Sequence, residues 1–126
     1  SEQEVVVLSA IDPANPYGWL LPWPYRDEDN KTGPRRVAGA SVVLVDGVVA
    51  LFVDKGGRRL VTFPAADDPD VALVAARALT TVAKRQRGKL LRIEKIDGEP
   101  ARTSKLAESL RAAAFTSDPR GLMLEA

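Results

Sequence analysis

The sequence predicts an α+β fold: an antiparallel meander or curled sheet, or a small β-barrel, with two helices on one side. Short valine-rich runs between residues 40 and 63 are separated by Asp-Gly and Gly-Gly turns. Apolar residues recur at helical spacing from about Asp70 to Arg85, and a second, shorter helical stretch starts near Ser104. Strands grouped together, without a strict β-α alternation, are typical of an α+β domain.

The amino-terminal part predicts one strand and one long loop. Val5 to Ala10 is apolar and mostly β-branched, which favours a strand. Prolines are then so frequent in residues 12–34 that neither a helix interior nor a central strand fits. Trp19 and Trp23 lie in this loop, and we expect both to pack in a core or against a neighbouring domain. The charged tail of the loop, residues 26–33, is expected to be mobile.

A meander follows the loop. Ala40–Val45 and Val48–Val53 are joined by Asp46-Gly47, which supplies the positive φ angles of a type I′ turn. Both strands are apolar at nearly every position, so we expect both faces to be covered. A second turn at residues 55–58 leads to a third strand, Arg59–Phe63. The predicted cross-strand pairs are Val45 with Val48, Leu44 with Val49, and Val42 with Leu51.

The remaining elements alternate between helix and strand. We predict a helix from Asp70 to Arg85, capped by Asp68 or Asp70. Its apolar face is formed by Val71, Val74, Ala75, Ala78 and Val82, and its other face by Arg77, Thr81 and Lys84. A strand from Leu90 to Ile96, a turn at Asp97-Gly98, a helix from about Ser104 to Ala113 and a last strand at 122–124 complete the chain.

Length and composition exclude several classes of protein. At 126 residues the chain fits one domain, residues 1–126. There is no cysteine and no histidine, which excludes disulfides, thiolate chemistry and Ser-His or His-metal sites. There is no Gly-rich phosphate loop ending in Lys-Ser or Lys-Thr and no Gly-x-Gly-x-x-Gly after a strand, so we expect no nucleotide hydrolysis and no cofactor in this chain. A metal site made of carboxylates alone stays possible, but the acidic residues are scattered or lie in turns, so no metal site is predicted. No apolar run is long enough to span a membrane and no signal peptide is visible, so a cytoplasmic protein is expected.

Positive charge gathers at the end of the first predicted helix. Lys84, Arg85, Arg87 and Lys89 lie close together in sequence there, and Arg77 precedes them on the same helix. Arg35 and Arg36 form a second basic pair. These seven residues are candidate contacts to DNA phosphates, and a solvated helix end is the competing interpretation.

Asp12 and the loop aromatics are the other candidates for chemistry. Asp12 follows an apolar strand, where a carboxylate can serve as a general base. Asp before Pro equally forms a side-chain-to-backbone turn, so both interpretations stay open. Tyr17, Trp19, Trp23 and Tyr25 can stack on unpaired bases or cover an apolar surface. No catalytic residue is assigned beyond Asp12, the minority candidate.

Three blocks in order resemble the carboxy-terminal end of the Lhr (large helicase-related) proteins. They are Leu8-Ser9-Ala10-Ile11-Asp12-Pro13-Ala14-Asn15-Pro16-Tyr17-Gly18, then Val43-Leu44-Val45-Asp46-Gly47-Val48-Val49-Ala50, then the tail Leu90 to Leu124 with Ile96-Asp97-Gly98-Glu99-Pro100-Ala101-Arg102. Asp-Gly hairpins are common in proteins, so the resemblance depends on the ordered set of blocks.

The resemblance implies a part of a larger protein. Lhr proteins are ATP-dependent superfamily 2 DNA helicases that act in DNA repair, so ATP and Mg²⁺ would bind to a core outside this chain. The resemblance also implies that winged-helix domains of the same protein are neighbours of this chain and that this chain is a final β-barrel-like module. It further implies a bacterial, nucleoid-associated location. The carboxy-terminal extension of long Lhr proteins, which these winged-helix domains and the final module form, is similar to alkylpurine DNA glycosylases. Their Gln-x-Gln or Gln-x-Asp signature is absent here, since Gln3 and Gln86 are the only glutamines.

Three functions therefore stand side by side. The first is a non-catalytic accessory domain that helps a DNA repair helicase engage DNA through the basic helix end. The second is a docking or homo-oligomerisation module that uses Trp19, Trp23 and the apolar hairpin. The third is a contribution to a glycosylase-like site through Asp12.

Overall fold

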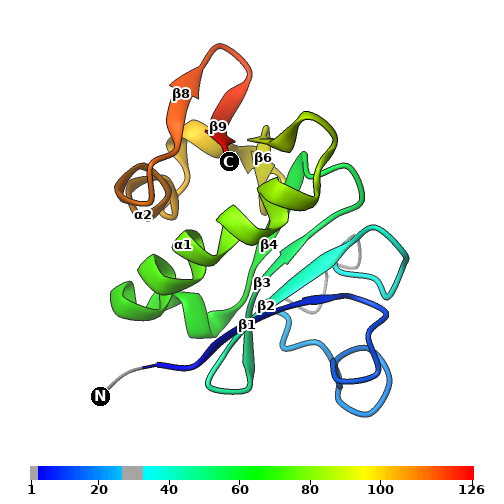
Figure 1. Cartoon of the computed structure of the whole chain (residues 1–126). Helices are drawn as coiled ribbons and strands as arrows, with labels where there is room; N and C mark the ends of the chain where they lie inside the picture. Colours follow the sequence, from blue (N-terminus) through cyan, green and yellow to red (C-terminus); the bar gives the residue numbers. More distant parts are fainter. Residues whose placement is uncertain (1–2, 27–32) are drawn as a thin grey trace.

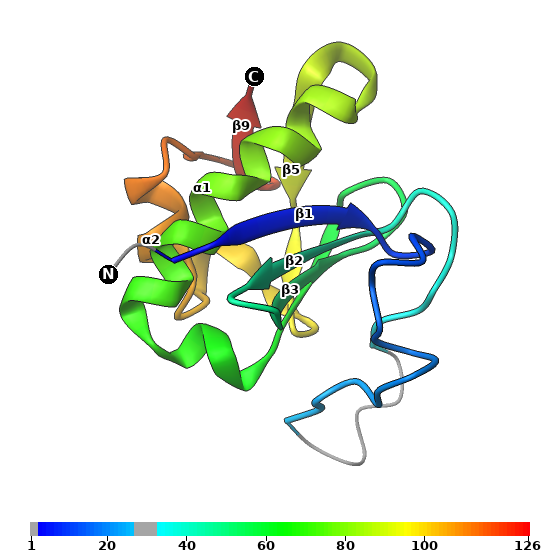
Figure 2. The same ribbon diagram turned by 60° about the horizontal axis from the view of Figure 1, so that its bottom comes forward.

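The computed structural model describes residues 3–26 and 33–126, and its long helix α1 (Pro69–Arg85) lies between two sheets (Figures 1 and 2). The first sheet has the strand order β1 (Val5–Ser9), β2 (Ser41–Val45), β3 (Val48–Val53), β4 (Arg59–Thr62), β6 (Lys95–Ile96) and β7 (Glu99–Pro100). The second has the order β5 (Leu90–Ile93), β9 (Gly121–Glu125) and β8 (Thr116–Asp118). The other elements are the short helix α2 (Ala107–Ala112) and the 3₁₀ turns η1 (Pro64–Asp67), η2 (Arg87–Lys89) and η3 (Ala101–Thr103).

The α+β class with a curled antiparallel meander and two helices is confirmed. The barrel alternative is wrong for the described strands, because β1 and β7 are the two outer strands of the first sheet and do not pair with each other. In the same described part, no helix is both long enough and apolar enough to cross a membrane.

Both faces of the meander are covered, as the sequence predicts. Val43 and Val45 of β2 pack with α1 in the larger core cluster. Val42 and Leu44 alternate with them and pack in a second cluster around Trp23 of the loop. Figure 2 shows the loop on the side of the sheet away from α1. Each fully buried Val or Leu contributes about 1.5–3 kcal/mol, so the two layers together hold the hairpin firmly.

The register of the hairpin corrects one predicted pair. Val45 faces Val48 and Leu44 faces Val49, as expected, but Val43 faces Leu51 and Val42 faces Phe52. The register shifts between Val43 and Leu44. The extra residue on β3 is a β-bulge, which places Ala50 and Leu51 in the same core cluster. A two-residue turn fixes the register only up to the first bulge.

The predicted strand from Leu90 to Ile96 is in fact two strands in two sheets. β5 pairs with β9, whereas β6 pairs in parallel with β4. Ile93 and Ile96 are both buried, and side chains three positions apart point to opposite faces of an unbroken strand. The break at Glu94 allows both to enter the core: the backbone N–H groups of Glu94 and Lys95 donate to the carbonyl of Arg58.

The first helix begins at a side-chain cap. The Asp68 carboxylate accepts a hydrogen bond from the N–H of Asp70 at 2.9 Å, and proline occupies the first helical position. Its buried stripe runs through Ala75, Leu79 and Val82, while Val71 is half-buried at the margin. α2 is shorter than predicted, because the 3₁₀ turn η3 and a bend precede it.

Candidate nucleic-acid interface

Exposed positive charge is concentrated where α1 ends. Four cationic side chains in the last turn of α1 and in η2 are exposed, and Arg77 on the same helix is exposed as well. None of these five forms an ion pair with a carboxylate of the described residues. We call the set the helix-end patch: Arg77, Lys84, Arg85, Arg87 and Lys89. The carboxyl end of a helix stabilises cations, and their unpaired charges remain available to a polyanion.

Arg35 and Arg36, although adjacent, have different surroundings. Arg35 is exposed and lines a hollow beside β4. The Arg36 guanidinium donates to the carbonyls of Asn15 at 2.7 Å, Tyr17 at 3.1 Å and Asp12 at 3.4 Å. These three backbone acceptors engage three of the five guanidinium donors, so Arg36 holds the loop in place.

The loop aromatics divide into buried and exposed groups. Trp23 is 8% exposed and stacks on Phe63 and Tyr17 with ring centroids 5.9 and 6.0 Å apart. Trp19 is 56% exposed, although its Nε1–H donates to the Asn15 carbonyl at 2.7 Å and the Arg36 guanidinium lies 5.5 Å from its ring centroid. The prediction that both tryptophans pack is therefore confirmed for Trp23 alone.

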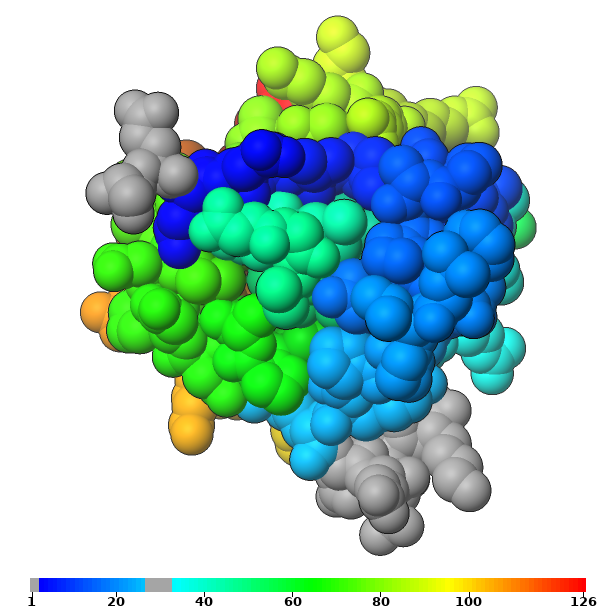
Figure 3. Space-filling model, turned by 90° about the horizontal axis from the view of Figure 1, so that it is seen from below, coloured from blue at the N-terminus to red at the C-terminus, as the bar shows by residue number. Residues whose placement is uncertain are grey.

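The exposed face of the loop is apolar. Figure 3 shows the loop beside the turn that joins β2 and β3. Four large apolar side chains of the loop are between 47% and 66% exposed, namely Ile11, Trp19, Leu20 and Leu21. Val48, the first residue of β3, is 46% exposed. The other side chains of β2 and β3 are buried within the chain, so a docking surface would consist of the loop rather than the hairpin.

Asp12 has the geometry of a turn residue. Its Oδ1 accepts the N–H of Ala14 at 2.8 Å, and its carbonyl accepts the N–H of Asn15 at 2.9 Å. The fully buried Asn15 continues the network: its amide donates to the Ala10 carbonyl and its Oδ1 accepts the N–H of Tyr17. These bonds are the side-chain-to-backbone turns expected of Asp and Asn in such loops.

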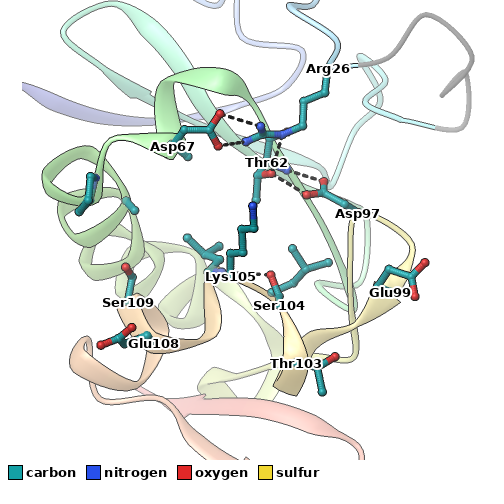
Figure 4. A pocket seen from close by; sticks show the side chains of 15 residues that line it. Arg26, Thr62, Asp67, Asp97, Glu99, Thr103, Ser104, Lys105, Glu108 and Ser109 are labelled. Carbon is teal, nitrogen blue, oxygen red and sulfur yellow. Dashed lines mark hydrogen bonds and ion pairs between the residues drawn. The ribbon is translucent and has the colours of Figure 1, made fainter.

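One cleft was not predicted from the sequence. It has a volume of about 710 Å³ and lies between η1, the turn after β6 and the segment that leads into α2 (Figure 4). Arg26 makes a two-pronged ion pair with Asp67 at 2.7 and 2.8 Å and donates to Thr62 Oγ1 at 3.1 Å. Thr62 donates its hydroxyl to Asp97 at 2.6 Å. Residues 27–32 of the tail predicted to be mobile lie outside the described residues, but Arg26 itself is anchored.

The charges along this network satisfy one another. The hydrogen bonds from Arg26 lower the pKa of Asp67 below its ordinary value, and the same bonds raise the pKa of Arg26. The Asp67 carboxylate is therefore charged near neutral pH and paired with a cation, so it is not poised to exchange a proton there. Lys105, Ser104 and Glu108 line the cleft without joining the network in Figure 4. Among the described residues, no group of three or more acidic side chains could hold a metal ion.

Comparisons with known proteins decide the family. No family model matches the chain. A "Lhr helicase/ probable uracil glycosylase" of Mycolicibacterium smegmatis is 42% identical over 130 residues, which covers 98% of this chain and 8% of that protein. A "Lhr helicase/uracil glycosylase" of Escherichia coli is 35% identical over 117 residues, which covers 93% of this chain and 7% of that protein. This chain belongs to the Lhr family.

Family membership confirms the resemblance seen in the sequence, and the alignments show how much of each relative the chain covers. The Lhr-family chain corresponds to less than a tenth of the length of either relative. The helicase and glycosylase names describe proteins more than ten times longer.

Proposed function

We propose that this chain is a non-catalytic accessory domain of an Lhr-type DNA repair helicase and that it helps the longer protein hold DNA. The observation that carries the proposal is the helix-end patch, with five exposed cations that have no ion-pair partner among the described residues. Lys and Arg contacts to phosphates position a protein on DNA without specifying sequence. The names of both relatives include a helicase, which agrees with such a role.

The chemistry of the chain supports an accessory role. It lacks histidine and cysteine, and Asp12 is engaged in a loop turn. In the proposal, ATP and Mg²⁺ bind to a core elsewhere in the longer protein, and winged-helix domains of that protein are the neighbours. These partners remain predictions.

The test is salt-dependent DNA binding by the 126-residue chain. Fluorescence anisotropy of labelled single-stranded and duplex oligonucleotides should show affinity that falls steeply from 50 to about 200 mM salt. Reversing two charges, Lys84→Glu with Arg85→Glu, should make the negative slope of log K against log salt less steep by roughly 2 on duplex DNA. Arg102→Glu with Arg120→Glu is a matched control, because both residues are exposed and remote from α1's end in sequence. Absence of salt-dependent binding at low salt, or equal losses in both variants, would contradict the proposal.

A second candidate function is docking to another protein surface, and the exposed apolar face of the loop favours it. The exposed apolar side chains of the loop are held on a braced backbone, and such patches mark protein interfaces. They would dock this domain against another domain of the longer protein or against a second copy. Light scattering and limited proteolysis of the longer protein, with and without Trp19→Ala and Leu20→Ala, test this function. An unchanged assembly state and unchanged cleavage of the loop would count against it.

A further inference from the structure

Two hollows adjoin one another beside the helix-end patch. One has a volume of about 490 Å³ and is lined by residues of β3, β4 and β6 and of the segment that follows the loop. The other, of about 300 Å³, is lined by Ser9, Ser41 and Gly56 and reaches Arg85 at the end of α1. Lys55 lines both hollows. We call them together the basic groove, and Arg85 joins this groove to the helix-end patch.

The basic groove carries an excess of positive charge. Four exposed cations line the larger hollow, namely Arg35, Lys55, Arg59 and Lys95. Two carboxylates, Asp54 and Asp97, line the same hollow, and each accepts a hydrogen bond from a backbone N–H. Asp54 accepts the N–H of Arg59 at 3.1 Å, and Asp97 accepts the N–H of Thr62 at 2.8 Å. None of the four cations forms an ion pair with a carboxylate in residues 3–26 and 33–126.

Two of these cations are register partners. Arg59 of β4 lies directly opposite Lys95 of β6 in the parallel pairing. Like charges directly opposite on neighbouring strands repel each other and destabilise the sheet. The nearby Arg58 pairs with Glu94 at 3.6 Å, so this edge accommodates an ion pair one position away. An anion bound between Arg59 and Lys95 would relieve their repulsion.

The groove is formed before any ligand arrives. Gly56 and Gly57 have φ angles of +96° and +75° and turn the chain sharply after Lys55. A Cβ at Gly57 would lie 2.6 Å from a Leu91 methyl, and one at Gly39 would lie 3.0 Å from Lys55 Cγ. This close packing holds the turn against β5, so a ligand need not order Lys55's backbone on binding.

We propose that the basic groove binds the sugar–phosphate backbone of a single DNA strand that continues from the helix-end patch through Arg85 and Lys55 to the Arg59–Lys95 pair. The inference rests on the proposed function, since it extends the same DNA contact across the edge of the sheet. The hollows provide a track for the backbone, and the four cations neutralise its phosphates.

The experiment compares three double variants of the 126-residue chain on a labelled single-stranded oligonucleotide. Arg59→Gln with Lys95→Gln removes the groove pair, Lys84→Gln with Arg87→Gln removes part of the helix-end patch, and Arg102→Gln with Arg120→Gln is the charge-matched control. Each lost phosphate contact should make the negative slope of log K against log salt less steep by about 0.7. For the groove variant we expect the steepness of this slope to fall by about 1.4 and the affinity to fall several-fold. For the control we expect no change in either.

A second measurement separates loss of folding from loss of binding. Because the Arg59–Lys95 repulsion is removed, the groove variant should unfold at a urea concentration at least as high as the original chain. If the helix-end variant weakens binding and the groove variant matches the control, the groove inference is wrong and the proposed function stands. If the original chain shows no salt-dependent binding, both are wrong. A groove variant that alone weakens binding would support the groove and overturn the role of the helix-end patch.

Discussion

Replacing Trp23 by alanine should cost this chain about 4 kcal/mol of unfolding free energy. Its ring is 8% exposed and contacts three aromatic rings with centroids about 6 Å away: Tyr17, Phe52 and Phe63. Truncation of a buried Trp typically costs roughly 3–5 kcal/mol, and each lost aromatic pair contributes about 0.5–1.5 kcal/mol beyond the buried area. Trp23 connects the loop to the sheet, so its loss removes one layer of cover from β2 and β3.

Trp19→Ala is the matched control, because the residue type and the loop are the same. At 56% exposure Trp19 gives up little buried area. It loses its bond to the Asn15 carbonyl, but that carbonyl keeps the Arg36 guanidinium at 2.7 Å. We expect a cost of about 1–2 kcal/mol from the lost hydrogen bond and the lost cation–π contact.

Urea unfolding of the 126-residue chain, followed by circular dichroism and extrapolated linearly to water, measures both costs. Trp23→Phe should fall between the original chain and Trp23→Ala, because the ring stack is partly retained. Equal costs for Trp19→Ala and Trp23→Ala would refute the assignment of one tryptophan to the core and the other to the surface. A Trp23→Ala cost below about 1 kcal/mol would also refute it.

Three further predictions follow from single contacts. Asp12→Ala should cost about 1 kcal/mol in urea unfolding and Asp12→Asn almost nothing, because an amide oxygen still accepts the Ala14 N–H; loss of base release by the longer protein in a stable Asp12→Asn variant would instead support catalysis. The hydrogen bond from Arg92 lowers the pKa of Asp118 below its ordinary value, so this carboxylate stabilises the fold above about pH 4 and the effect is lost as pH falls through the lowered pKa. Urea midpoints from pH 7 to 3 should fall less steeply in Asp118→Asn, and an unchanged profile would contradict this. Gly121→Ala should cost about 2–3 kcal/mol in the same assay, because its Cβ would collide with the Ile93 carbonyl oxygen; a neutral result would contradict the β5–β9 packing.

The parts of the fold predicted correctly are those that local chemistry determines. The Asp46-Gly47 turn has φ angles of +50° and +81°, as a two-residue hairpin requires. Asp68 caps α1 because a short acceptor before the first turn meets a free N–H in almost any context. The valine runs form strands because β-branched residues fit a sheet that is covered on both faces.

The parts predicted wrongly or not at all depend on residues far apart in the chain. The bulge in β3 follows from packing on both sides of the sheet, which a turn signal does not encode. Arg26 was assigned to a mobile tail, yet it bonds to Asp67, 41 positions later. Arg36 stays a candidate phosphate contact, but its bonds to carbonyls 19 to 24 positions earlier were not predicted. A guanidinium has the same sequence signature whether its acceptor is a phosphate or a backbone carbonyl.

Asp46 and Asp97 show where sequence reasoning about a site reaches its limit. Each precedes glycine, each has a positive φ, of +50° and +53°, and each was predicted to be a turn residue. The Asp46 carboxylate accepts a backbone N–H from Glu4 at an exposed edge. The Asp97 carboxylate accepts both the N–H and the hydroxyl of Thr62 and lines both the cleft and the basic groove. The local chemistry of the two turns is the same. Only the strand that lies beside each turn distinguishes a carboxylate that serves a simple hairpin from one that links two surfaces.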